Sequence, residues 1–238
     1  MKILKHLPNT ITSFNLLFGT IAVIYGFQGQ TVIAVMLVLA AAACDFLDGF
    51  VARLIKAYSP MGKELDSLAD LISFGLAPTI LLFYRYGETQ GFQFTTFIPL
   101  TITIASALRL AKFNVDTRQT ENFIGMPTPA NAILICMLLH FSTYNSLFDP
   151  LLDSKWFIPL FSILMSWLLV CNIPMFSLKL KSLKWKGNEL RFGIIITAVV
   201  LFLTVVISGT TWSISILFVF VLYIIINVLQ YLITLVRK

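Results

Sequence analysis

The sequence has 238 residues, of which 58% are hydrophobic and only 12% are charged. Because a soluble domain carries about 25% charged residues, this composition excludes an ordinary soluble protein and indicates a chain whose main solvent is lipid. The formal net charge is +6, but no soluble surface combines basic and aromatic residues, so nucleic acid is not an expected partner.

Apolar segments long enough to cross a membrane recur along the whole chain. A membrane-spanning helix needs about 20 mostly apolar residues. Eight segments meet this description: 10–28, 31–54, 62–84, 93–113, 128–147, 155–177, 190–208 and 211–236. The sequence therefore predicts an all-α, polytopic membrane helix bundle with about eight transmembrane helices.

The first segment follows Lys2 and Lys5, an arrangement that is also typical of signal peptides. However, its apolar stretch is long, no small-residue cleavage site follows it, and the second segment begins almost at once. We therefore expect a retained helix, with Asn9 and Thr10 as an N-terminal cap.

Four of the eleven acidic residues gather at the second and third segments: Asp45, Asp48, Asp66 and Asp70. Residues three or four positions apart share a helix face, so each pair should project from one side of its helix. The residues that should break the helix between the pairs are Tyr58, Ser59, Pro60 and Gly62. A short turn would make the two helices antiparallel neighbours, and the four carboxylates would then converge.

Converging carboxylates at membrane depth need cations to remain ionised. Hard divalent metals with oxygen ligands are the natural partners, so Mg²⁺ or Mn²⁺ is expected. Two such ions about 4 Å apart could clamp a phosphoryl group. Zinc is disfavoured because neither His6 nor His140 lies near the acids in the sequence. The alternative is a helix-packing role, but that would not require four acids beside one nearby arginine.

The residues that follow Asp48 suit a phosphate ligand. Arg53 lies five residues beyond Asp48 and is the expected phosphate partner. Gly49 and Ala52 leave room beside the carboxylate for a closely packed ligand.

Together these residues match the motif of the CDP-alcohol phosphotransferase family. The motif is D-x-x-D-G-x-x-A-R, eight residues, then G-x-x-x-D-x-x-x-D, and here it runs from Asp45 to Asp70. The resemblance implies a six-helix membrane core, usually homodimeric, that transfers a phosphatidyl or related group from a CDP-linked donor to an alcohol and releases CMP.

The same resemblance implies roles for individual residues. Asp45, Asp48, Asp66 and Asp70 would be metal ligands, and Asp70 also the general base. The residues of the CDP-donor site would include Gly49, Ala52, Arg53 and Gly62, and Asn9 and Thr10 would contact cytidine if they do not simply cap the helix.

Further stretches resemble membrane-embedded phosphatidylserine synthases of bacteria and archaea. They are LPNTITSFNLLFG (7–19), DSLADLISFGLAP (66–78), RLAKFN (109–114) and FIGMPTPA (123–130). This resemblance implies CDP-diacylglycerol and L-serine as substrates. Candidate acceptor-binding residues are Ser73, Arg109, Lys112 and Asn114, with Arg109 the first choice for the serine carboxylate. The alternatives are topology anchors for Arg109 and Lys112, and a helix C-cap for Asn114.

Basic residues predict the orientation of the chain. If eight helices start from a cytoplasmic N-terminus, only Arg85 and Lys155 lie at outer connections, which leaves fifteen of the seventeen Lys and Arg inside. The densest cluster is Lys179, Lys181, Lys184, Lys186 and Arg191. The positive-inside rule thus predicts a cell-membrane protein with both termini and the active site facing the cytoplasm.

The catalytic core is expected at 1–178, with six helices, and residues 179–238 should add a basic cytoplasmic loop and two further helices. Two alternatives stay open at this point. One is the same enzyme class with another acceptor, such as glycerol 3-phosphate or an inositol phosphate, for which Arg118 and the lysine cluster could supply a basic pocket. The other is an ion transporter lined by carboxylates.

Overall fold

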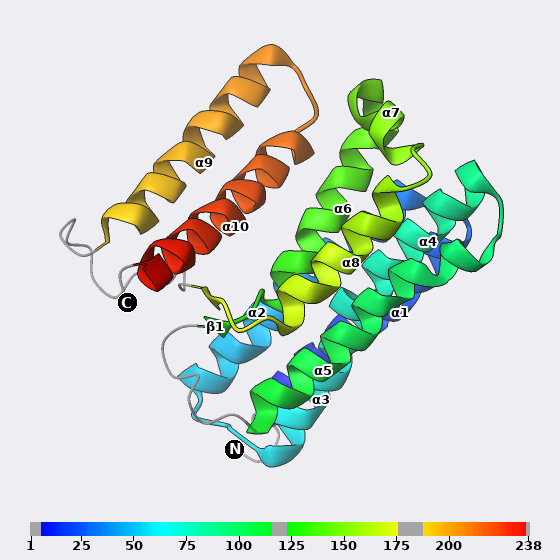
Figure 1. Cartoon of the computed structure of the whole chain (residues 1–238). Helices are drawn as coiled ribbons and strands as arrows, with labels where there is room; N and C mark the ends of the chain where they lie inside the picture. Colours follow the sequence, from blue (N-terminus) through cyan, green and yellow to red (C-terminus); the bar gives the residue numbers. More distant parts are fainter. Residues whose placement is uncertain (1–5, 116–122, 176–187, 237–238) are drawn as a thin grey trace.

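The computed structural model describes residues 6–115, 123–175 and 188–236, which form a bundle of helices (Figure 1). In chain order the elements are α1 (Leu7–Phe27), α2 (Thr31–Leu54), α3 (Pro60–Asp70), the π-helical segment η2 (Leu71–Leu76), α4 (Ala77–Gln90), the 3₁₀ helix η3 (Phe94–Leu100), α5 (Thr101–Val115), β1 (Phe123–Ile124), α6 (Thr128–Tyr144), the 3₁₀ turn η4 (Ser146–Phe148), α7 (Asp149–Leu152), α8 (Phe157–Val170), β2 (Pro174–Met175), α9 (Glu189–Ser208) and α10 (Ser213–Val236). The two short strands pair antiparallel. The predicted all-α class is confirmed, and this strand pair is the only β structure within the described ranges.

Six helical spans are long and apolar enough to cross a membrane: Leu7–Phe27, Thr31–Leu54, Pro60–Gln90, Phe94–Val115, Glu189–Ser208 and Ser213–Leu235. A seventh is reached if α6 and the helical turns after it count as one span, although the chain bends there by 109°. The structure therefore gives six or seven spans where the sequence predicted about eight.

The predicted segment 155–177 accounts for the difference. Its helix, α8, has only 14 residues and ends at Val170. Pro174 disfavours helical backbone at the residue before it, and Ile173 accepts a hydrogen bond from the amide of Gly125 instead (2.9 Å). The chain therefore leaves the helix to form β2, and residues 171–175 of the predicted segment are not helical.

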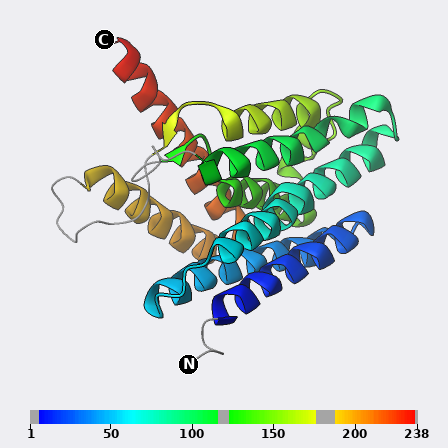
Figure 2. The same ribbon diagram turned by 90° about the horizontal axis from the view of Figure 1, so that it is seen from below.

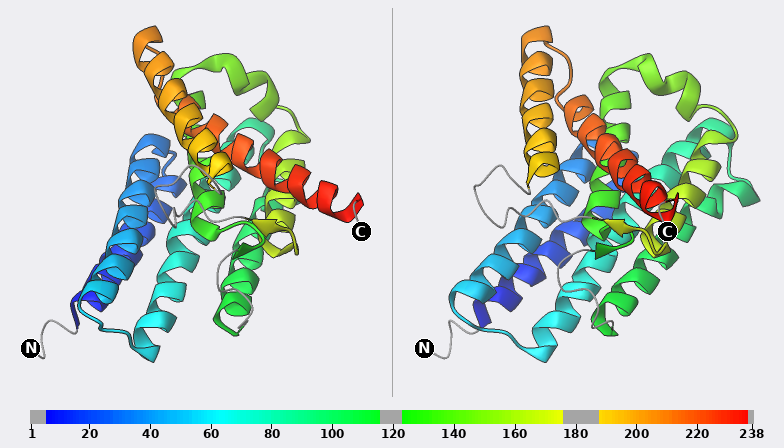
Figure 3. Two further views of the ribbon diagram at one scale, coloured as in Figure 1. Left: turned by 90° about the vertical axis from the view of Figure 1, so that its left-hand side faces the viewer. Right: turned by 60° about the vertical axis from the view of Figure 1, so that its left-hand side comes forward.

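Helix α1 packs through a narrow seam of small and polar residues. The buried residues of this helix recur every three or four positions: Pro8, Thr12, Asn15, Gly19, Ala22 and Gly26. Small residues allow membrane helices to approach closely, since lipid gives them no hydrophobic reason to associate. Through this seam α1 packs against α2, α3, η2 and α4, and it lies beside α2 in both views of Figure 3.

The turn between α2 and α3 runs from Ile55 to Ser59. Ser59 caps α3, because its hydroxyl accepts a hydrogen bond from the amide of Gly62 (3.0 Å), and Pro60 occupies the first helical turn. Gly62 therefore lies inside α3 and does not break the helix as predicted. Helices α2 and α3 come together at the carboxylates of Asp45, Asp48 and Asp66, as predicted, and α1 packs against both helices.

A π-helical segment follows Asp70 directly. Pro78 has no amide hydrogen and its ring would crowd the carbonyl four residues earlier, so a regular α-helix cannot continue through this point. Thr79 donates its hydroxyl to the carbonyl of Gly75 (2.6 Å), and Thr103 of α5 donates to the same oxygen (3.2 Å). These hydroxyls satisfy a carbonyl that the irregular helix leaves available, and π-helical turns are frequent at functional sites.

Helix α6 lies at the centre of the bundle, and eleven of its residues are buried. Helix α10 packs on α6, whereas α9 packs mainly on α10 and stands at the margin of the molecule (Figure 2). The two C-terminal helices therefore extend the bundle from one side, and α10 is the one that joins them to it.

Arg85 and Lys155, the two basic residues expected at outer connections, lie close together. Arg85 forms an ion pair with Asp153 (2.6 Å), and the carbonyl of Lys155 accepts a hydrogen bond from Tyr86 (3.0 Å). The lysines of the predicted basic cluster and Arg118 lie outside the described residues, whereas Arg191 begins α9.

Candidate active site

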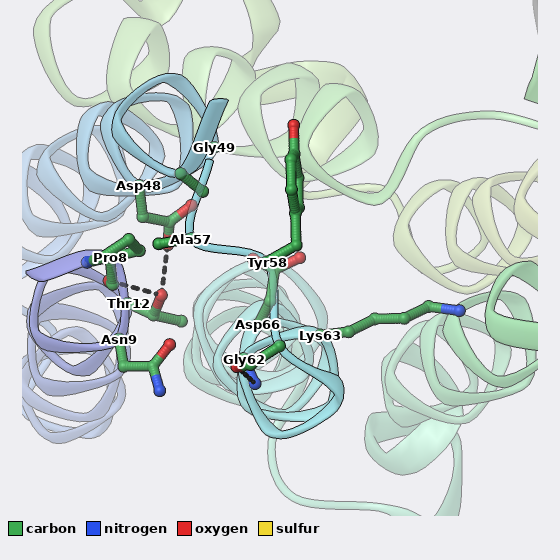
Figure 4. A pocket seen from close by; sticks show the side chains of 12 residues that line it. Pro8, Asn9, Thr12, Asp48, Gly49, Ala57, Tyr58, Gly62, Lys63 and Asp66 are labelled. Carbon is green, nitrogen blue, oxygen red and sulfur yellow. Dashed lines mark hydrogen bonds between the residues drawn. The ribbon is translucent and has the colours of Figure 1, made fainter. Parts of the chain in front are cut away.

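A pocket of about 230 Å³ opens where α1 begins, α2 ends and α3 begins (Figure 4). Its lining residues come from these three helices and from the turn that joins α2 to α3: Pro8, Asn9, Thr12, Asp48, Gly49, Ala52, Ala57, Tyr58, Ser59, Gly62, Lys63 and Asp66. The pocket therefore lies at one end of the bundle, and the predicted motif forms most of its wall.

Three of the four predicted metal ligands come together beside this pocket. Asp45, Asp48 and Asp66 each offer a carboxylate oxygen, and these oxygens lie within 4.8 Å of one another. Thr12 of α1 donates its hydroxyl to the carboxylate of Asp48 (2.6 Å), which fixes that side chain (Figure 4). One oxygen of Asp66 is buried and has no hydrogen-bond partner among the described residues.

Asp70 lies one helical turn beyond Asp66 and is buried, with 8% of its surface exposed. It interacts electrostatically with Asp45 and Asp66, but its oxygens do not join the group of three. Asn15 of α1 donates a hydrogen bond from its side-chain amide to Asp70 (3.3 Å). Asp70 is thus adjacent to the cluster of three, and a side chain of α1 holds it in place.

Among the predicted acceptor-binding residues, Arg109 is the one that interacts with Asp70. It is buried in α5, donates from Nη1 to the hydroxyl of Thr128 (3.0 Å), and interacts electrostatically with Asp70. Its Nε is buried without a partner among the residues that the structure describes. A buried guanidinium with an unused N–H can donate a hydrogen bond to the carboxylate of a ligand.

The predicted donor-site residues divide into two groups. Asn9, Gly49, Ala52 and Gly62 line the pocket. Thr10 is exposed and donates to the carbonyl of His6 (3.1 Å). Arg53 is also exposed, and its Nε donates to the carbonyl of Gly49 (2.9 Å), so the structure does not bring it into the pocket. A Cβ placed on Gly49 would meet no atom within 4 Å, so the protein's own packing does not require a glycine there.

The other predicted acceptor residues have partners elsewhere. The hydroxyl of Ser73 donates to the carbonyl of Asn15 (2.9 Å) and joins η2 to α1. Lys112 donates to the side chain of Asn172 (3.0 Å). Asn114 donates to Ser67 (2.9 Å) and its carbonyl accepts from Lys63 (2.8 Å), which ties the end of α5 to α3.

Two residues that contact the aspartates were missed in the sequence. Thr12 and Asn15 bond to Asp48 and Asp70, respectively. The signal that could have found them is their spacing from Asn9, because positions 9, 12 and 15 place three polar residues on one side of the helix. Thr10, which the sequence analysis chose instead, lies outside this face of the helix.

The residues at the cluster fit a divalent metal. Three carboxylates provide the hard oxygen ligands that Mg²⁺ and Mn²⁺ prefer. The buried oxygen of Asp66 has no partner among the described residues, as expected of an atom reserved for a cation. No histidine belongs to the cluster, since His140 in α6 hydrogen-bonds to Ser213 (3.1 Å). Asp45, Asp48 and Asp66 thus form a candidate divalent-metal site.

Comparison with known proteins identifies the family of the chain. A family model described as CDP-alcohol phosphatidyltransferase matches residues 5–171. The chain is 37% identical over 188 residues to the CDP-diacylglycerol–serine O-phosphatidyltransferase of Helicobacter pylori, which covers 75% of this chain and 74% of that protein. It is 36% identical over 142 residues to the enzyme of the same name from Bacillus subtilis, with 60% of this chain and 78% of that protein covered.

An archaeal relative extends the comparison. The archaetidylserine synthase of Methanothermobacter thermautotrophicus is 35% identical over 145 residues, which is 59% of this chain and 60% of that protein. The family model alone covers more than half of the sequence. The chain belongs to the CDP-alcohol phosphatidyltransferase family.

Proposed function

We propose that this protein is a phosphatidylserine synthase that transfers the phosphatidyl group from CDP-diacylglycerol to L-serine and releases CMP. The observation that carries the proposal is the carboxylate cluster at the pocket, with Asp70 and Arg109 beside it. The relatives named for serine transfer cover between 60% and 75% of the chain and support the choice of acceptor. Family membership also favours an enzyme over an ion transporter.

The donor would occupy the pocket between α1, α2 and α3. Its cytidine would lie near Asn9 and Gly62, and its pyrophosphate would extend past Gly49 and Ala52 toward the carboxylates. Arg53 would join the phosphates if its side chain released the Gly49 carbonyl. The acyl chains would remain in lipid between the helices.

Asp45, Asp48 and Asp66 would hold the divalent ions, with Asp70 as the fourth ligand. We propose two ions, Mg²⁺ or Mn²⁺, which when bound neutralise the phosphate oxygens and stabilise the charge that develops on CMP. Thr12 keeps Asp48 oriented toward the other carboxylates.

The transfer itself is a direct displacement. Asp70 accepts the proton of the serine hydroxyl, and that oxygen attacks the phosphorus attached to diacylglycerol. The bond from this phosphorus to the bridging oxygen breaks, and CMP leaves with that oxygen. Within the described residues no Ser–His or Cys–His pair adjoins the pocket to provide a covalent nucleophile. Arg109 would bind the serine carboxylate.

The proposal also covers the setting of the enzyme. We infer from the distribution of basic residues that the pocket faces the cytoplasm, in the cell membrane, with both chain ends on that side. The resemblance to the family supports a homodimer. The aspartate that takes the proton would then work at the inner surface, where serine and CMP are soluble.

One experiment tests the function directly. Purified protein in detergent is given CDP-diacylglycerol with L-serine, glycerol 3-phosphate, inositol phosphate or no acceptor, and CMP is measured. Serine should raise CMP release well above the control without acceptor, and phosphatidylserine should appear in equal amount. If glycerol 3-phosphate or inositol phosphate supported release and serine did not, the acceptor assignment would be wrong while the family assignment remained.

A further inference from the structure

Asn15 occupies an unusual position for a polar side chain in a membrane helix. It is fully buried in α1, at the point where α1 meets η2. Its side-chain nitrogen donates to Asp70 (3.3 Å), and its backbone carbonyl accepts the hydroxyl of Ser73 (2.9 Å). The residue is therefore held from both sides, directly beside the proposed general base.

The side-chain oxygen of Asn15 is left without a partner. It is buried, and no hydrogen-bond donor reaches it among the described residues. The amide orientation is fixed by Asp70, because turning the amide over would set its oxygen against a carboxylate oxygen. A buried acceptor without a donor costs free energy, so its presence calls for an explanation such as a ligand.

Arg109 shows the complementary feature near the same aspartate. Its Nη1 is used by Thr128, but its Nε is buried without a partner within the described part of the chain. Arg109 and Asn15 both interact with Asp70. Two polar atoms near Asp70 are thus unused: Nε of Arg109, a cationic hydrogen-bond donor, and the side-chain oxygen of Asn15, a neutral acceptor.

These two atoms suit an amino acid whose hydroxyl lies close to both of its charges. In serine, the ammonium and the carboxylate are on the carbon next to the hydroxymethyl group. A site that binds all three groups needs a cation, an acceptor and a base within a few atoms of one another. A neutral amide oxygen can accept from an ammonium group without adding another negative charge beside the carboxylate cluster.

We propose that Asn15 determines acceptor specificity, with its side-chain oxygen binding the serine ammonium group while its side-chain nitrogen holds Asp70 toward the serine hydroxyl. This inference rests on the proposed function, because it assigns a residue to the acceptor of that reaction. It adds α1 to the acceptor site, which the sequence had placed on the third to fifth spans alone.

The test replaces Asn15 with leucine, which has a similar volume and no hydrogen-bonding atoms. Serine KM should rise at least about tenfold, as expected for loss of a hydrogen bond to a charged group, while CDP-diacylglycerol KM stays within about twofold. The matched control is Thr20→Val, because Thr20 is exposed on the same helix and bonds only to the carbonyl of Leu16 (2.8 Å). This control should leave both KM values unchanged.

Competition by two serine analogues separates recognition of the ammonium group from a general disturbance. L-Alanine retains both charges and propanoate lacks the ammonium, and neither has the reacting hydroxyl. In the wild-type protein alanine should compete with serine more strongly than propanoate does. In Asn15→Leu this preference should disappear.

Several results would overturn the inference. These are an unchanged serine KM in Asn15→Leu, an unchanged preference for alanine in that variant, or no such preference in the wild type. If Asn15→Leu does not fold, as judged by size-exclusion profile and thermal unfolding, Asn15→Ala is measured in the same way with the same expectation. Wild-type protein that releases no CMP with serine would refute the proposed function instead, so the two failures are distinguishable.

Discussion

At the scale of single residues, the candidate site depends on carboxylates that repel one another unless a cation is present. Asp45, Asp48 and Asp66 bring oxygens within 4.8 Å of one another, and the hydroxyl of Thr12 donates a hydrogen bond to Asp48. This donor compensates one carboxylate only. The remaining negative charge must be balanced by bound metal ions or by protons. Binding of metal ions requires that all three carboxylate ligands are present.

Single replacement of these ligands should abolish most of the activity. CMP release is expected to fall by about a hundredfold or more in each of Asp45→Asn, Asp48→Asn and Asp66→Asn. The reason is that a metal ion stabilises the charge on the phosphate in the transition state by several kcal/mol, and loss of a ligand weakens this stabilisation. The variants should still insert and purify. Glu88→Gln, an exposed acid at the far end of α4, is the matched control. Normal turnover in two of the three variants would contradict the metal site.

Metal removal should also be visible without any turnover. A ligand present at 100 times its Kd stabilises the folded state by about 2.7 kcal/mol. Wild-type protein stripped with EDTA should therefore unfold at a lower temperature, by several degrees, and Mg²⁺ or Mn²⁺ should restore the value. In Asp48→Asn the thermal shift on adding metal should be much smaller. An identical shift in wild type and variant would place the binding elsewhere.

At the scale of helices, the site depends on how closely α1 approaches η2. A Cβ on Gly19 would lie 2.7 Å from the Cα of Ser73, which is closer than real Cβ contacts allow. The neighbouring atoms belong to backbone as well as side chain, so they cannot simply move aside. This approach brings Asn15 within hydrogen-bonding distance of Asp70.

Gly19→Ala should therefore force α1 away from η2. We expect a destabilisation of about 1–3 kcal/mol, typical of overpacking, together with a clear loss of CMP release. Gly193→Ala in α9 is the matched control, because a Cβ there would meet nothing within 4 Å. The double variant Gly19→Ala/Ser73→Ala should not recover, since the Cα of residue 73 remains. The idea fails if thermal unfolding and turnover of Gly19→Ala equal those of the control.

Sequence reasoning succeeded where local spacing alone decides the outcome. The aspartate motif, the helix break before Pro60 and the apolar spans follow from the order of residues and from helix geometry. It failed where a distant element decides. Helix α8 stops at Val170 because the following residues pair with β1, and α1 packs against both α2 and α3.

The site shows the same division. Arg109 interacts electrostatically with Asp70, and the sequence had placed both at the same end of neighbouring helices. Lys112 and Asn114 share that end, but their side chains bind Asn172 and Ser67. The sequence did not predict Thr12 and Asn15 as site residues, because their partners are on other helices, more than thirty positions away. Such contacts depend on the rotation of α1 about its axis, which the sequence fixes only through packing.

At the scale of the whole molecule, the inferred orientation can be measured by labelling. Single cysteines are introduced at Glu64 and Glu88 in a background without Cys44, Cys136 and Cys171. Both positions are exposed and lie near opposite ends of the helical span Pro60–Gln90. Glu64→Cys should react only from the cytoplasmic side and Glu88→Cys only from the outside, in intact cells and inverted vesicles. Reversed labelling would refute the predicted topology.

The boundary predicted near residue 178 would separate a catalytic core from the last two helices. The contacts of α10 suggest that the two parts work together. Helix α10 packs on α6, and the buried Tyr223 interacts electrostatically with Arg109. Residues 179–238 lie beyond the segment that the family model matches. The arginine proposed to bind serine is thus influenced by a helix outside the matched region.

This coupling predicts a measurable effect of Tyr223→Phe, which removes only the hydroxyl. A lost polar interaction of about 0.5–1.5 kcal/mol corresponds to a serine KM that rises roughly two- to tenfold, because the guanidinium loses a partner that helps to orient it. CDP-diacylglycerol KM should change little, since Tyr223 does not line the donor pocket. The control is Tyr231→Phe, farther along the same helix and partly exposed. If both variants keep the wild-type serine KM, α10 supports the bundle mechanically and takes no part in binding the acceptor.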